Sequence, residues 1–143
     1  MLNFTITELC KSDVAKKRNI CNLPQRADIY DNLLNLVFYC LQPLRDKIGK
    51  ATIITSGYRC NRLNKLVGGS DTSHHLQGKA VDFVVANMKV RDVFNFIIDS
   101  GQKWTQLIEE HANGKVWVHL SYDPKNLKCE ALKYDNGKYI KVK

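Results

Sequence analysis

The stretch SHHLQGKAVD, residues 73–82, brings two histidines, a glycine and a carboxylate together within ten positions. Its end overlaps the apolar segment AVDFVVA, residues 80–86, which predicts a buried strand with Asp82 inside it. His119 occupies a similar position in the apolar segment VWVHL, residues 116–120. Because a polar group is costly to bury unless it is paired or bound to a metal, both residues are candidates for a functional site.

Two imidazoles and one carboxylate, from His75, Asp82 and His119, make a known type of catalytic zinc set that leaves a fourth position for water. Each residue also has a structural explanation when it is taken alone. An aspartate in a strand often forms an ion pair with an arginine, and a histidine in a strand is often only hydrogen-bonded. The spacing by itself therefore leaves both interpretations open.

Around this stretch, apolar residues at three- and four-residue spacing predict helices. The expected helices cover residues 8–17, 28–48, 61–67 and 89–100. Thr7 is the expected N-cap of the first helix. Pro43 lies inside the second helix, and its missing N–H is expected to kink the last turn or to split off a short final piece.

The remaining apolar segments predict strands and hairpins. Strands are expected at residues 51–56, 80–86, 106–110 and 115–121, with a further hairpin in residues 128–142. Asn113-Gly114 and Asn136-Gly137 are strong signals for two-residue hairpin turns. Helices early and hairpins late predict an α+β fold with helices packed on a mostly antiparallel sheet. The length of 143 residues predicts a single domain, residues 1–143.

The composition is that of a globular protein, with 44% hydrophobic and 25% charged residues, and it excludes disorder, collagen and coiled coil. Lys and Arg number 22 and Asp and Glu 14, so the net charge is +8. This excess favours an anionic partner such as nucleic acid, a membrane surface or an acidic cell-wall polymer. Basic and aromatic residues do not cluster on one element, so we expect no nucleic-acid partner.

Five scattered cysteines, none in a C-x-x-C pair, favour free thiols in a reducing compartment over a disulfide framework. Charged residues interrupt the N-terminus before an apolar run can build, so no signal peptide is predicted. The longest apolar run, residues 37–41, is too short to span a bilayer. We therefore expect synthesis in the cytoplasm without membrane insertion, and release by another agent if the protein acts outside.

The residues around the first stretch form a longer pattern. The motif S-x-H-x-x-G-x-A-x-D is matched at Ser73, His75, Gly78, Ala80 and Asp82. The pattern continues in TSGYR (55–59), LN (63–64), VGG (67–69), QLI (106–108) and WVH (117–119). It covers about residues 41–121 and resembles the zinc D-Ala-D-Ala carboxypeptidase family, which includes small phage and bacterial enzymes that cut peptidoglycan stem peptides. The resemblance implies the hedgehog/D,D-peptidase fold and one zinc ion per chain, held by His75, Asp82 and His119.

The resemblance also implies contacts with the substrate. Arg59 is expected to contact the substrate or its developing oxyanion, and Ser73 to hold the substrate or its loop. Tyr58, beside Arg59, is assigned to the substrate contacts as well. Trp117 is expected to form a wall of the cleft or to pack in the core, since it is a large aromatic residue on the face of His119.

One position departs from the family pattern. Several relatives carry an acidic residue or a histidine three residues before the last zinc histidine, and this chain has Val116 there. Valine cannot take a proton, so the general base has to come from elsewhere. The departure also keeps open a second interpretation, a non-catalytic zinc-binding module of the hedgehog-like branch.

Hairpin geometry suggests which residue replaces that base. If residues 113–114 are the two central turn residues, Glu110 lies opposite Trp117 and shares a face with His119, because side chains alternate along a strand. Glu109 then points to the other face. We predict Glu110 as the catalytic base, and a three-residue loop would favour Glu109 instead.

These observations predict a zinc-dependent hydrolase that cleaves a peptide bond in peptidoglycan stem peptides. The D-Ala-D-Ala carboxypeptidase type, the L-Ala-D-Glu endopeptidase type and cross-bridge cleavage all stay open. A short basic enzyme with free thiols and no signal peptide fits a phage lysin or a tail-associated peptidase. We expect a monomer that works on the cell wall after release.

Overall fold

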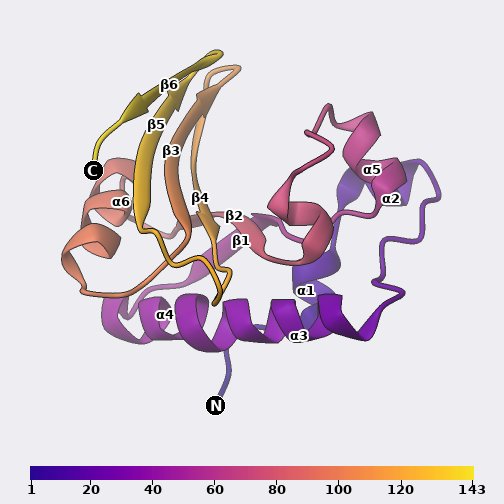
Figure 1. Ribbon diagram of the computed structural model, residues 1–143, viewed down its shortest axis with the longest axis horizontal. Helices are drawn as coiled ribbons and strands as arrows, with labels where there is room; N and C mark the ends of the chain where they lie inside the picture. The colour runs from indigo at the N-terminus through magenta and orange to yellow at the C-terminus, as the bar shows by residue number, and fades with distance from the viewer.

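The computed structural model describes residues 1–143 and has a six-stranded sheet at its centre (Figure 1). The strand order across the sheet is β1-β2-β4-β3-β5-β6. The strands are β1 (Thr52–Ser56), β2 (Ala80–Val85), β3 (Gln106–Ala112), β4 (Lys115–Ser121), β5 (Glu130–Asp135) and β6 (Lys138–Lys141). Neighbouring strands pair antiparallel except for β3 and β5, which run parallel. The predicted α+β class with a mostly antiparallel sheet is confirmed.

The β3–β4 hairpin has the register that its turn sequence predicts. Asn113 and Gly114 both have positive φ, 52° and 74°, as a two-residue turn of the primed kind requires. Ile108 then pairs with His119, and Glu110 pairs with Trp117. The three-residue loop that would have favoured Glu109 is therefore not formed.

The rest of the regular structure is helical. They are α1 (Ile6–Cys10), α2 (Asp13–Lys17), α3 (Ala27–Leu36), the π-helical turn η1 (Val37–Leu41), α4 (Gln42–Ile48), α5 (Asn61–Leu66), the 3-10 turn η2 (His74–Gln77) and α6 (Val90–Asp99). None of these helices combines the length and the hydropathy needed to cross a bilayer.

The single helix expected at residues 8–17 is wrong, because the chain forms α1 and α2 there. Lys11 between them is extended, and the Ser12 side chain accepts a hydrogen bond from the backbone N–H of Ala15. Serine at an N-cap satisfies a free N–H of the first turn, so it starts a new helix. Thr5, and not Thr7, caps α1.

The long helix predicted at residues 28–48 is continuous, and Pro43 changes its hydrogen bonding without breaking it. Proline has no N–H to donate to the carbonyl of Tyr39, four residues earlier. The backbone N–H of Gln42 bonds instead to the carbonyl of Val37, five residues earlier, which makes the π-helical turn. Gly49 ends the helix in the left-handed region, with φ of 70°.

The two faces of the sheet differ in what covers them. One face packs on α6 and joins the hydrophobic core, where several strand side chains are fully buried. These include Val81, Phe83, Leu107, Val118 and Leu120. Since side chains alternate along a strand, Asp82 and His119 point to the opposite face. Figure 1 shows that face of β3–β6 turned toward α2 and α5, which come from two separate segments of the chain.

Gly57 is a point of close approach between the end of β1 and α1. A Cβ atom at this position would lie 2.0 Å from the backbone oxygen of Leu9. We expect Gly57→Ala to lower the free energy of unfolding by about 3 kcal/mol or more, because backbone atoms have to move. A Cβ atom at Gly114 would contact no other atom, so Gly114→Ala is strained only by its positive φ. We expect it to lower the free energy of unfolding by about 1 kcal/mol. Urea unfolding of both variants measures the difference, and an equal or smaller loss for Gly57→Ala would contradict this packing.

Candidate metal centre

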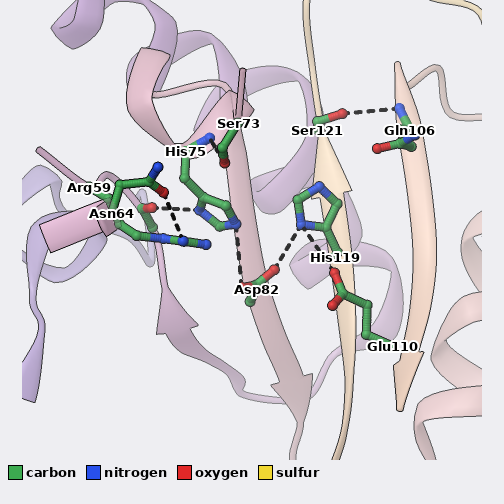
Figure 2. A network of polar contacts seen from close by, with 10 residues as sticks. Arg59, Asn64, Ser73, His75, Asp82, Gln106, Glu110, His119 and Ser121 are labelled. Atoms are coloured by element: carbon green, nitrogen blue, oxygen red, sulfur yellow. Dashed lines mark hydrogen bonds and ion pairs between the residues drawn. The ribbon is translucent and has the colours of Figure 1, made fainter. Parts of the chain in front are cut away.

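Three potential ligands converge on the open face of the sheet. Asp82 on β2 pairs directly with His119 on β4, and His75 approaches from η2. One ligand atom from each of the three side chains lies within 4.8 Å of the other two. His75 Nε2 is 3.3 Å from Asp82 Oδ2, and His119 Nδ1 is 2.9 Å from Asp82 Oδ1. Figure 2 shows the two imidazoles on either side of the carboxylate.

Local hydrogen bonds fix the orientation of His75. The Ser73 side chain accepts a hydrogen bond from the His75 backbone N–H, at 3.2 Å, and so begins η2. Gly78 ends this turn with φ of 70°. The ring Nδ1 donates to the backbone oxygen of Gly57, at 2.7 Å. Because a carbonyl oxygen can only accept, Nδ1 is the donor here, and Nε2 is the ring nitrogen that faces Asp82, as second-shell bonds arrange it at metal sites.

The electrostatics of the cluster keep the carboxylate ionised. Burial alone would raise the pKa of Asp82, but His75 and His119 outweigh it and hold this pKa well below its usual range. The Asp82 side chain is only 12% exposed. A buried carboxylate with two imidazole nitrogens matches the N and O ligands of a three-residue zinc site. The residues present therefore fit a zinc-type ion.

Glu110 lies beside this cluster. Its Oε1 is 3.6 Å from His119 Nδ1, on the same face of the sheet (Figure 2). Burial raises the pKa of Glu110, and the nearby Asp82 raises it further, against opposing effects of His119 and Arg59. A carboxylate whose pKa is raised toward neutrality is better suited to proton transfer at neutral pH.

Glu109 and Val116 point to the opposite face. The Glu109 carboxylate is buried against α6, where Arg91 Nη2 and His111 Nε2 lie 2.8 and 2.7 Å from its Oε2. These bonds, Arg91 first, lower the pKa of Glu109 to about 2 despite burial. Val116 pairs with His111 across the hairpin. Neither residue can reach the cluster on the open face.

Arg59 borders the cluster with part of its hydrogen-bonding capacity unused. Its Nη1 donates to Asn64 Oδ1 at 3.0 Å, and Asn64 is itself held by the backbone oxygen of Ser70. The Nε atom of Arg59 is buried and has no partner. Burial lowers the pKa of Arg59, while Asp82 and Glu110 act in the opposite direction. The guanidinium is thus held in place as a donor toward the groove.

Two hollows meet at the cluster, one of about 560 Å³ and one of about 520 Å³. The residues that line both are Arg59, Val67, Asp82 and Trp117. Ser73 lines the larger hollow together with the two histidines and Glu110. Tyr58 is only 7% exposed and packs in the core, but it borders the smaller one. The groove therefore extends on two sides of the cluster.

Sequence reasoning missed several residues that support the site. Asn64 is 1% exposed and positions Arg59; the LN pair (63–64) belongs to the sequence pattern, but nothing in the sequence assigned this role to it. The turn η2, which presents His75, is too short to show periodicity. Tyr134 and Tyr139 line the larger hollow, and only the parallel pairing of β5 with β3 brings them there.

A His–Asp–His cluster in an open groove is the ligand set of many metal-dependent hydrolases. A sequence model described as peptidase M15 matches residues 2–121. The chain belongs to the peptidase M15 family and is a metallopeptidase. No protein in the curated set matches the chain. The resemblance of the sequence to the zinc D-Ala-D-Ala carboxypeptidase family is confirmed at the level of the family.

The ion pair between buried Glu109 and exposed Arg91 leads to a prediction about acid stability. A carboxylate whose pKa is lowered by folding stabilises the protein fully above its ordinary pKa of 4.5, and this stability is lost as the pH falls toward about 2. Glu109→Gln is expected to cost on the order of 1–3 kcal/mol at pH 7. The difference in the free energy of unfolding between Glu109→Gln and wild type should shrink as the pH falls from 4.5 to 2. Chemical unfolding across this range measures it, and a constant difference would contradict the assignment.

Proposed function

We propose that this metallopeptidase is zinc-dependent and hydrolyses a peptide bond in peptidoglycan stem peptides, with His75, Asp82 and His119 as the metal ligands. One observation carries the proposal: three ligand atoms from three separate elements lie within 4.8 Å of one another in an open groove. Membership of the M15 family supports the same chemistry. One ion per chain is expected, because the chain offers one such cluster.

When bound, zinc would supply Lewis-acid chemistry, polarising the scissile carbonyl and lowering the pKa of water. Glu110 acts as general base: it takes the proton from the attacking water and returns it to the leaving amine. Its distance of 3.6 Å from His119 and its raised pKa support this role. The hairpin register puts Glu110 on the face of His119, so it can take the place of the acidic residue that is missing at Val116.

Arg59 donates hydrogen bonds to the oxyanion that develops during attack. Its unpartnered Nε and its support by Asn64 favour a preorganised donor, and such a donor contributes roughly 3–4 kcal/mol in comparable sites. Trp117 and Tyr58 contact the substrate from the walls of the two hollows, and Ser73 holds the loop of His75. Each of these roles rests on a side chain that borders the groove.

The groove favours the endopeptidase type over the carboxypeptidase type. A carboxypeptidase needs room for only one residue beyond the scissile bond, whereas the hollows here extend on both sides of the cluster. We therefore propose cleavage within the stem peptide, as at an L-Ala-D-Glu bond, rather than removal of a terminal D-Ala. The net charge of +8 supports action as a monomeric lysin on anionic cell wall.

Metal analysis tests the ligand set. His75→Ala, Asp82→Ala and His119→Ala should each lose the zinc that the wild type holds at one ion per chain, because each removes one of three protein ligands. His111→Ala is the matched control: this histidine pairs with Glu109 on the opposite face and should leave zinc unchanged. Full zinc content in all three ligand variants would refute the assignment.

Replacement of the proposed base separates an enzyme from a zinc-binding module. Glu110→Gln should lower the rate of peptide hydrolysis by about 10²–10⁴-fold and should keep zinc. Glu109→Gln, one residue away on the other face, should retain the rate at pH 7. Mass spectrometry of fragments from purified peptidoglycan reads out both the rate and the bond cut. Zinc-loaded wild-type protein that cleaves nothing would favour the module.

A further inference from the structure

The β5–β6 hairpin lines one side of the groove, and its residues lie outside the part of the chain that matches the family. The match ends at residue 121, and the hairpin begins at Glu130. The parallel pairing of β5 with β3 adds this hairpin to the sheet next to the strand that carries Glu110. Figure 1 shows β5 and β6 as the last two strands of the sheet, beyond β3.

The hairpin contributes two tyrosines to the same face as the cluster. Across four neighbouring strands, Trp117 pairs with Glu110, Glu110 with Tyr134, and Tyr134 with Tyr139. All four residues line the larger hollow. The two tyrosine rings are 4.8 Å apart, tilted by 50°, and Tyr139 is 64% exposed. Strands are about 4.8 Å apart, so this aromatic pair begins near Glu110 and extends away from it.

The two hollows differ in charge. Beyond the cluster, the larger hollow offers uncharged polar and aromatic groups, including Ser70, Thr72, Tyr134 and Tyr139. The smaller hollow, on the other side, is lined by Lys11, Lys115 and Asp13. A neutral ligand rich in hydroxyl groups therefore suits the hairpin side, and a chain that carries carboxylates suits the lysine side.

From this juxtaposition we propose that the Tyr134–Tyr139 pair is a saccharide subsite, which binds the glycan part of a stem-peptide substrate while the peptide extends toward Lys11 and Lys115. This inference rests on the proposed function. Sugar rings present C–H groups on their faces and hydroxyls on their edges, so they pack on exposed tyrosine rings and bond to their hydroxyls. The subsite lies to one side of Glu110, so it contributes to substrate binding rather than to the chemical step.

Two substrates that differ only in the sugar test this subsite. One is a soluble disaccharide-peptide released from peptidoglycan by a glycosidase, and the other is the same peptide freed from its sugars by an amidase. Tyr139→Ala should raise KM for the disaccharide-peptide about tenfold, the cost of one aromatic contact. Its kcat should be unchanged, since uniform binding is lost, and the free peptide should be cleaved as before.

Two further variants control for the hairpin itself. Tyr139→Phe keeps the ring and should retain most of the preference for the sugar-bearing substrate. Ile140→Ala changes the neighbouring residue, which lies on the opposite face beside Arg91, and should leave the ratio of the two kcat/KM values unchanged. An equal loss on both substrates, or no loss on either, would overturn the saccharide subsite and leave the proposed peptidase standing.

A binding measurement separates failure of the subsite from failure of the proposed function. The disaccharide without peptide is titrated into the zinc-loaded wild type and into Tyr139→Ala, with tyrosine ring resonances followed by NMR. Shifts in the wild type that are lost in Tyr139→Ala support the subsite even if no peptide bond is cut, an outcome that would refute only the peptidase. No shift in the wild type overturns the subsite.

Discussion

The cross-strand pair of Asp82 and His119 is the constraint on which the rest of the site depends. An ionised carboxylate in an apolar strand is stable only when opposite charge or hydrogen-bond donors compensate its lost hydration. Here His119 lies on β4 directly opposite Asp82, and His75 approaches from η2. Together the two histidines hold the pKa of Asp82 below its usual range. These imidazole nitrogens and this carboxylate are also the kinds of ligand that a divalent ion needs. The arrangement that makes burial of Asp82 tolerable therefore also suits metal binding.

Alternation along the strands divides the sheet into a face that packs on α6 and a face that carries the His75–Asp82–His119 cluster. In β3, Glu109 is buried against α6 and pairs with the more exposed Arg91, while Glu110 points toward the cluster. Two adjacent carboxylates thus have opposite pKa shifts, one lowered by its ion pair and one raised by burial. The position of a two-residue turn puts them on different faces, because a slip of one residue would exchange their faces.

Much of this organisation could be predicted from the sequence where local signals are strong. Asp82 and His119 stand out because they interrupt apolar strands, and Asn113-Gly114 determines the register that selects Glu110. Weak or competing local signals explain the errors: Ser12 divides the first helix, and a π-helical turn accommodates Pro43.

Long-range pairing was beyond the reach of sequence patterns. Nothing local indicates that β5 pairs parallel with β3, and this pairing alone brings the two tyrosines of the hairpin to the groove. The support of His75 by the Gly57 carbonyl likewise joins residues 18 positions apart without a periodic signal. Such contacts depend on tertiary packing, which is why they emerge only with the fold.

Zinc-edge anomalous diffraction from crystals of the zinc-loaded protein tests the central claim most directly. The account predicts one anomalous peak, about 2.0–2.2 Å from His75 Nε2, an Asp82 carboxylate oxygen and His119 Nδ1. A peak bound elsewhere, or an ion that contacts fewer than these three side chains, would contradict it.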